Sequence, residues 1–236
     1  MLKGLKKGAL TLTTVFLAAV AMAKPVSSNG LVLWFRNGPD TLKLRDASPQ
    51  KNNGTATSVI VSNSPSLVSM QTTRQLTLAA WIKPNSVGFE FPVIIAKGGN
   101  NGPNAYGGYE LVLNSNGDND VIFASGAFYA DTHAANGSLI NHHLGEWIHV
   151  AVTIDAVNQT LQFYIDGVPY SNVYTSGAFS AINFDLPNNL YVGAPDPGSD
   201  SDFASFDGTI RQVRVYNRTL SADEIQKIFS SGQPKK

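Results

Sequence analysis

The chain has no cysteine among its 236 residues and few charged residues, at 14%. Without thiols it has no disulfide, no cysteine-ligated metal and no thiol nucleophile, so its fold depends on a hydrophobic core. A chain of this length can build such a core as one all-β domain. Basic residues number 17, as do acidic ones. Because a basic excess is absent, we expect no nucleic-acid partner.

The N-terminus has the pattern of a secretory signal peptide. Several lysines precede an uncharged stretch at residues 8–23, which ends in Ala-Met-Ala. A membrane-spanning helix needs about 20 apolar residues, and this shorter run also contains threonines. We expect a signal peptide at 1–23 that is removed before Lys24, with an uncleaved anchor as the alternative. The mature chain is then secreted or periplasmic in a bacterium, with no membrane span.

Apolar stretches recur along the chain, and each ends at Gly, Pro, Asn or Asp. This spacing predicts short strands joined by turns, as in an antiparallel sandwich. The stretch at 147–154 carries apolar residues on both faces and is expected to lie inside its sheet. The predicted strands are 31–36, 54–61, 76–84, 93–97, 106–113, 120–124, 147–154, 161–166, 168–174, 189–193 and 208–217.

Two local patterns define a hairpin and a helix. Asp166-Gly167 lies between apolar runs and predicts a type I′ turn, because both residues tolerate a positive φ. Pro169 follows and lacks an N–H, so the second arm is expected at a sheet edge. Ser221 and Glu224 have the spacing of a capping box. The apolar face of the helix they start consists of Ile225, Ile228 and Phe229.

Five segments occur in an order typical of one family: RDASPQKNNGT (45–55), LTLAAWIKP (76–84), GEWIHVAVTID (145–155), LQFYIDG (161–167) and FDGTIRQVRVYNRTLSADEI (206–225). They resemble the laminin-G-like jellyroll family of the concanavalin A-like lectin and glucanase superfamily. The resemblance implies an all-β, antiparallel two-sheet jellyroll sandwich over 24–231, with one short C-terminal helix and a polar tail at 232–236. This fold hosts lectins, adhesion modules, glycosidases and lyases, so the site must decide the function.

A catalytic pair of carboxylates on one strand is missing. Retaining glucanases of the superfamily carry an E-x-D-x-E pattern, and their acid and nucleophile lie about 5 to 5.5 Å apart. None of the four glutamates has an acidic residue two or four positions away. We predict no catalytic residue and a non-enzymatic module. The alternative is a glycoside hydrolase or polysaccharide lyase with an atypical site, in which Tyr129 and His133 act as base and acid.

Two segments combine aromatic rings with polar side chains, the mixture that sugar-binding sites use. The predicted ligand-binding residues are Tyr106, Tyr109, Phe128, Tyr129, Asp131, His133 and Asn136. The expected partner is a glycan or another extracellular, cell-surface ligand. In another interpretation Phe128 and Tyr129 alternate along a strand, and one of them belongs to the core. A third possibility is a structural partner in a cell-surface assembly, recognised through an exposed sheet edge.

Calcium is not expected at the place that the resemblance implies. The family's last long strand often carries an aspartate ligand, whereas this chain has Arg211, which has no acceptor and repels a cation. We expect Arg211 to pair with Asp207 or Asp46. The weak candidates for a metal site are Asp196, Asp200 and Asp202, which are otherwise solvated turn residues.

Three aromatic residues lie within strand motifs of the family. We expect Trp81 and Trp147 in the core, because each lies in an apolar run. We expect His149 to be a buried structural histidine whose ring nitrogens are hydrogen-bonded.

Overall fold

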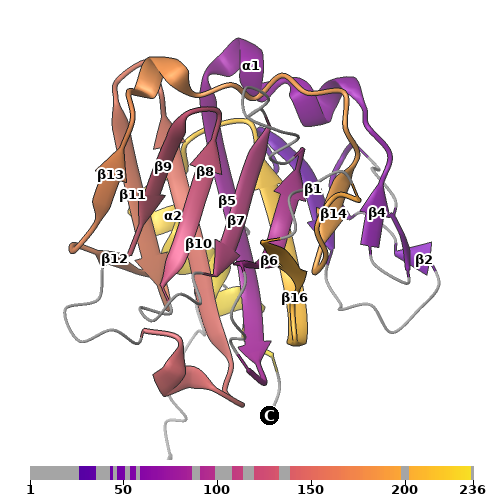
Figure 1. Ribbon diagram of the computed structural model, residues 1–236, viewed down its shortest axis with the longest axis vertical. Helices are drawn as coiled ribbons and strands as arrows, with labels where there is room; N and C mark the ends of the chain where they lie inside the picture. Colours follow the sequence, from indigo (N-terminus) through magenta and orange to yellow (C-terminus); the bar gives the residue numbers. More distant parts are fainter. Residues whose placement is uncertain are drawn as a thin grey trace, which may run out of the picture.

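The computed structural model describes residues 27–35, 43–44, 47–50, 54–56, 59–86, 91–98, 108–113, 120–132, 139–197 and 202–234. Within these ranges, strands build two sheets that lie face to face, and one longer helix covers the outer side of one sheet (Figure 1). The predicted all-β jellyroll sandwich with a C-terminal helix is confirmed. None of the helices in these ranges combines the length and the apolar character needed to span a bilayer.

The first sheet has six strands and contains the predicted central strand and hairpin. Its order is β1 (Leu31–Phe35), β16 (Gly208–Tyr216), β5 (Gln75–Pro84), β10 (Ile148–Asp155), β11 (Thr160–Ile165) and β12 (Val168–Tyr170). All of β10 is buried between β5 and β11, as predicted. The turn has φ of 50° at Asp166 and 79° at Gly167, which confirms the hairpin. Pro169 lies in β12 at the sheet edge, also as predicted.

The second sheet is antiparallel except at one strand. Its order is β13 (Tyr174–Ser176), β9 (Phe128–Asp131), β8 (Val121–Ser125), β7 (Tyr109–Leu113), β6 (Phe91–Lys97), β14 (Leu190–Val192), β4 (Val59–Val61), β3 (Gly54–Ala56) and β2 (Lys43–Leu44). β15 (Phe203–Ser205) pairs with β6 in parallel. The predicted strand at 54–61 is in fact the β3–β4 pair. The predicted strand at 168–174 is divided between β12 and β13, in different sheets.

The main core lies between the two sheets and is aromatic as well as aliphatic. Alternate residues of β10, among them Val150 and Val152, face inward to meet residues of the second sheet such as Leu111 and Phe123. Short helical turns close the connections around it. They are η1 (Pro65–Val68), α1 (Met70–Thr73), η2 (Asn141–His143) and η3 (Phe179–Ala181).

The helix α2 (Ala222–Gly232) begins at the predicted capping box. The Glu224 N–H donates to Ser221 Oγ at 3.3 Å, and the Ser221 N–H donates to Glu224 Oε2 at 3.0 Å. Arg218 donates two hydrogen bonds to the same carboxylate, and this pairing lowers the pKa of Glu224 to about 2. α2 also includes Gly232, the first residue of the expected polar tail.

The outer face of the six-stranded sheet is covered by α2, which makes a second buried cluster. Ile225 and Ile228 pack there against Ala79, Ala151 and Tyr164, as the apolar face of the helix predicted. Figure 1 shows α2 on the far side of this sheet from the second sheet.

Two of the aromatic residues differ from expectation. Trp81 is buried as predicted, but it lies on the outer face, stacked on Phe229 with ring centroids 5.3 Å apart. The prediction of a core position for Trp147 is wrong, because this ring is only partly buried and lies just before β10. His149 is fully buried beside Trp81, but neither ring nitrogen has a hydrogen-bond partner. The prediction of a hydrogen-bonded ring is therefore wrong, and burial together with nearby Arg214 lowers the pKa of His149 to about 3.

Candidate ligand-binding hollow

One row of residues crosses the outer face of the second sheet and alternates large with small side chains. Strand pairing places Tyr191 beside Ala96, Ala96 beside Glu110, Glu110 beside Ala124, and Ala124 beside Tyr129. Paired residues of neighbouring strands point to the same side of a sheet, so all five share this face. The two alanines add no bulk beyond Cβ, which leaves space on either side of Glu110.

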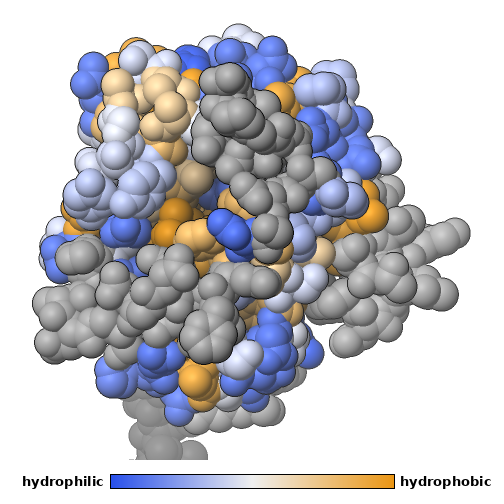
Figure 2. All heavy atoms as spheres, in the orientation of Figure 1, coloured by the Kyte–Doolittle hydropathy of each residue, from blue (hydrophilic) through white to orange (hydrophobic). Residues whose placement is uncertain are grey.

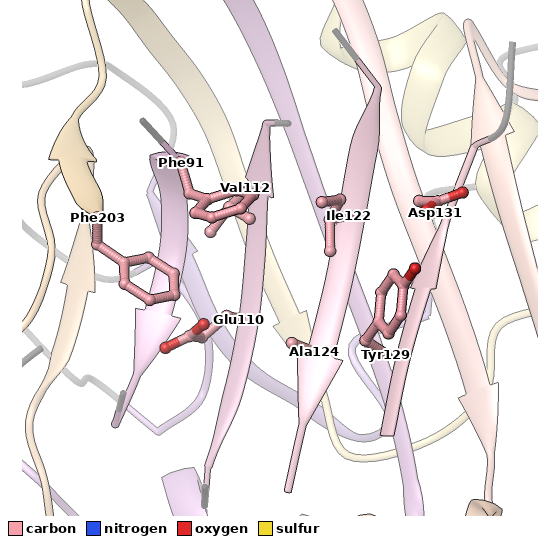
Figure 3. A pocket seen from close by; sticks show the side chains of 8 residues that line it. All are labelled: Phe91, Glu110, Val112, Ile122, Ala124, Tyr129, Asp131 and Phe203. Atoms are coloured by element: carbon pink, nitrogen blue, oxygen red, sulfur yellow. The ribbon is translucent and has the colours of Figure 1, made fainter. Parts of the chain in front are cut away.

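That space is part of a hollow with a volume of about 290 Å³. Its floor includes Val112 and Ile122, which form a small apolar cluster on this face. Phe91 and Phe203 make one wall, with ring centroids 5.7 Å apart. The hollow is lined by Phe91, Glu110, Val112, Ile122, Ala124, Tyr129, Asp131 and Phe203. In Figure 3, Glu110 lies between the two phenylalanines and Tyr129, and Figure 2 shows apolar side chains gathered near the centre of the same face.

Glu110 is a buried acid of the hollow. Its side chain is only 7% exposed, and no hydrogen bond or ion pair joins it to another described residue. Burial, with a smaller contribution from the charge of Asp196, raises the pKa of Glu110 to about 8. At neutral pH the free protein therefore holds this carboxyl mainly in its protonated form, which can both donate and accept a hydrogen bond.

Tyr129 offers an exposed ring at the opposite end of the hollow. It is 38% exposed and lies against Tyr174, which is 50% exposed, with ring centroids 5.7 Å apart. Its hydroxyl points toward Asp131 in Figure 3. Burial and then the charge of Asp131 raise the pKa of Tyr129, so the hydroxyl stays protonated. A planar apolar surface thus stands next to a neutral hydroxyl and a carboxylate.

The predicted ligand-binding residues divide between the hollow, the core and the part of the chain that is not described. Tyr129 and Asp131 lie in the hollow. Tyr109 and Phe128 do not, because both face inward and are at most 1% exposed in the main core. For Phe128 and Tyr129 the structure agrees with the alternating strand, one ring inside and one outside. Tyr106, His133 and Asn136 lie outside the described residues.

Sequence reasoning missed the acid Glu110 and the two rings Phe91 and Phe203 among the lining residues. Glu110 carried a signal, since it is a single acid within the apolar run Tyr109–Leu113. Phe91 and Phe203 carried none, because they meet only through the parallel pairing of β15 with β6.

Two of the three aspartates named as weak candidates for a metal site lie in the described part of the chain. Asp196 accepts a hydrogen bond from Asn188 Nδ2 at 2.7 Å. The Asp202 carbonyl accepts from the Phe91 N–H at 2.7 Å, which helps to hold β15 beside β6. Asp200 lies outside the described residues. Among those described, no three His, Cys, Asp or Glu side chains gather in a way that could hold a metal ion.

Arg211 does not make the predicted ion pair with Asp207. Its guanidinium lies over the Trp147 ring, 5.4 Å from the centroid, while Asp207 accepts hydrogen bonds from Asn85 and Ser86. Asp207 is exposed and already accepts hydrogen bonds from these neutral donors. The face of the Trp147 ring is a partner that Arg211 can contact with less loss of hydration than an ion pair would require. Asp46, the other proposed partner, is outside the described residues.

Comparison with known proteins agrees with the architecture. Residues 53–226 match the family model of the concanavalin A-like lectin/glucanases superfamily, and the chain belongs to this superfamily. The laminin-G-like, concanavalin A-like resemblance is thereby confirmed.

Solved structures with a similar fold include several toxin binding domains. The binding domain of botulinum neurotoxin DC in complex with SialylT is 15% identical with a TM-score of 0.60, over 87% of this chain and 52% of that one. The same domain in complex with rat synaptotagmin II is 16% identical with a TM-score of 0.58, over 88% and 53%. The binding domain of Paraclostridial Mosquitocidal Protein 1 is 16% identical with a TM-score of 0.58, over 86% and 52%. The chain spans about half the length of these structures, and the likeness shows the fold.

Proposed function

We propose that this protein is an exported, non-enzymatic carbohydrate-binding module. The observation that carries the proposal is the exposed ring of Tyr129 in one hollow with Glu110 and Asp131. An aromatic face covers the apolar side of a pyranose, and the neighbouring polar groups take its hydroxyls. Two structures of similar fold hold SialylT or rat synaptotagmin II, so those domains recognise a glycan and a protein, which supports a role in binding.

The spacing of the two acids argues against a retaining glycosidase. β7, which carries Glu110, and β9, which carries Asp131, are separated by β8. Two strand spacings amount to about 9.6 Å between backbones. Asp131 is also displaced along its strand, because it pairs with Ile122 while Glu110 pairs with Ala124. The acid and nucleophile of a retaining enzyme would have to approach to about 5 to 5.5 Å.

Glycan hydrolysis at an atypical site is the second candidate, and one observation favours it. The pKa of Glu110 is raised to about 8, as a general acid requires. A reducing-end assay on a panel of polysaccharides separates the two functions. If the wild type is active and a folded Glu110→Gln variant is not, the protein is an enzyme and the proposal of a non-enzymatic module is wrong. The absence of activity, together with measurable binding, supports the module.

A glycan array followed by calorimetry tests the binding function with matched variants. Tyr129→Ala removes the exposed ring and should weaken binding of any glycan found by at least about tenfold, the loss of one stacking contact. Val157→Ala is the control, because Val157 is 66% exposed in a turn away from the hollow. Equal affinity of wild type and Tyr129→Ala would contradict the proposed site.

Export is part of the proposal and rests on the lysines and the apolar run before Lys24. Intact-mass measurement of protein recovered from the periplasm or medium of an expressing bacterium should give a chain that starts at Lys24. A full-length mass, or a protein confined to the cytoplasm, would contradict export and leave the binding function to be judged by the array.

A further inference from the structure

We propose that the hollow selects ligands that carry a protonated amino group, so that its preferred glycan contains amino sugars without N-acetyl groups. The inference rests on the proposed function and specifies the ligand class of the same site. Three features of the hollow support it: acidic side chains without basic ones among the described lining residues, the isolation of Glu110 and the aromatic rings around it.

The described residues that line the hollow include two carboxyl groups and no basic side chain. The carboxyl groups belong to Glu110 and Asp131, and none of the described lining residues is a lysine, arginine or histidine. Lys97 follows Ala96 on β6 but pairs with Tyr109 and so points to the opposite side of the sheet. It is fully buried and donates to the carbonyls of Leu186 and Asn188 at 2.6 and 2.7 Å. The ammonium group of Lys97 is therefore bound to these carbonyls and does not line the hollow.

Among the described residues, Glu110 has no partner of the kind that a buried carboxylate needs. Its side chain is nine-tenths buried, directed into the hollow, and not joined to any described residue by a hydrogen bond or ion pair. Ionisation is costly there because of burial and because of the charge of Asp196. An ammonium group in the hollow would compensate both effects, whereas a uronate or sialate carboxylate would add a further buried negative charge.

The aromatic rings favour the same ligand. Phe91 and Phe203 stand on one side of Glu110, and Tyr129 stands beyond Ala124 on the other. Ring faces attract cations, and the effect grows when the cation is removed from water. The same faces also contact the apolar side of a sugar ring. The volume of about 290 Å³ suits one sugar residue, being at the lower limit of ordinary ligand pockets.

Calorimetry at pH 6 in about 0.15 M salt compares three tetrasaccharides of equal length: β-1,4-linked glucosamine, its N-acetylated counterpart and galacturonate. We expect the glucosamine tetramer to bind at least about tenfold more tightly than the N-acetylated one, and the galacturonate not to bind. Because Glu110 is protonated in the free protein, binding of the charged amine should release close to one proton. Buffers with different heats of ionisation measure that release.

Glu110→Gln should lose both the preference for the amine and the proton release, so that it binds the two tetramers with similar affinity. Glu146→Gln makes the same chemical substitution at an exposed residue outside the hollow and should behave as wild type. A loss of preference in both variants would overturn the inference, because it would show a general attraction between the protein and a cationic ligand.

Two further outcomes separate this inference from the proposed function. If neutral glycans bind as tightly as the glucosamine tetramer, the inference fails and the carbohydrate-binding function stands. Choline and its uncharged isostere 3,3-dimethylbutanol test the ammonium site without a sugar. Binding of choline alone, with no glycan bound, would support the ammonium site and overturn the carbohydrate function. Binding of none of these probes would overturn both.

Discussion

Asp166 and His149 exchange two hydrogen bonds at the turn of the β11–β12 hairpin. The Asp166 N–H donates to the His149 carbonyl at 2.9 Å, and the His149 N–H donates to Asp166 Oδ1 at 2.8 Å. The carboxylate therefore acts as a ladder partner for the neighbouring strand β10, whose first residues would otherwise face a turn. The aspartate of the Asp-Gly pair thus has a tertiary role as well as a positive φ of 50°.

Replacing Asp166 should show how much its side-chain acceptor and its left-handed backbone contribute together. Asp166→Ala leaves the buried N–H of His149 without an acceptor and should lower the free energy of unfolding by about 1 to 3 kcal/mol. Asp166→Asn keeps a side-chain oxygen and tolerates the left-handed backbone, so its loss should be under about 1 kcal/mol. Urea unfolding measures both. Equal losses in the two variants would mean that the negative charge, and not the acceptor oxygen, is what matters.

Trp81 and Trp147 are expected to contribute differently to the stability of the protein, although both lie in strand motifs of the family. Trp81 is 4% exposed and contacts both His149 and Phe229, so Trp81→Ala should cost about 3 to 5 kcal/mol. Trp147 is partly buried beneath Arg211, and Trp147→Ala should cost about 1 to 2 kcal/mol. Urea unfolding of both variants checks the order. A larger loss for Trp147 would place it, and not Trp81, at the better packed position.

The sequence predicted most of the fold because its local patterns were strong. The apolar alternation of β10, the Asp166-Gly167 turn and the Ser221 capping box each act over a few residues and were visible without tertiary knowledge. Trp147 was misplaced because an apolar neighbourhood in the sequence does not say where a strand begins. Tyr129 and Phe128 were indistinguishable until the face of β9 was known.

The hollow was harder to predict because its arrangement depends on strand pairing. Glu110 lies between Ala96 and Ala124 only through the β6–β7 and β7–β8 ladders. Phe91 and Phe203 meet only through a parallel pair. The sequence alone identified Tyr129 and Asp131 as candidate binding residues. That Glu110 is surrounded by small residues and aromatic rings could not be predicted, because it depends on how the strands pair.

Calcium should not stabilise the protein at the place that the family resemblance implies. Arg211 occupies that place and rests over Trp147. A structural ion at about a hundred times its dissociation constant would add about 2.7 kcal/mol to the free energy of unfolding. Thermal unfolding of chelator-treated protein should therefore show no shift in midpoint on adding millimolar calcium. A rise of several degrees would contradict this, and its loss in Asp196→Asn would assign the ion to the loop of Asp196.

The stability of the protein should depend on pH through Glu110 in a way that Glu110→Gln removes. The pKa of Glu110 is 4.5 as a free side chain and about 8 in the folded protein. Between these values the folded state binds the extra proton, so this stabilising contribution is complete below pH 4.5 and is lost as the pH rises through 8. The loss has a ceiling of about 1.4 kcal/mol per pH unit.

We therefore expect Glu110→Gln to gain at least about 1 kcal/mol relative to wild type between pH 5 and pH 8, measured as the difference of two urea-unfolding series. His149, whose folded pKa is lowered to about 3, has the opposite dependence, with stability that falls as the pH drops below its free value of 6.5. Since His149 is present in both proteins, its contribution cancels in the difference. Glu146→Gln, the same substitution at an exposed residue outside the hollow, is the control. A flat difference for Glu110→Gln would show that this carboxyl is solvated and ionised, and it would remove the basis for proton release on binding an amine.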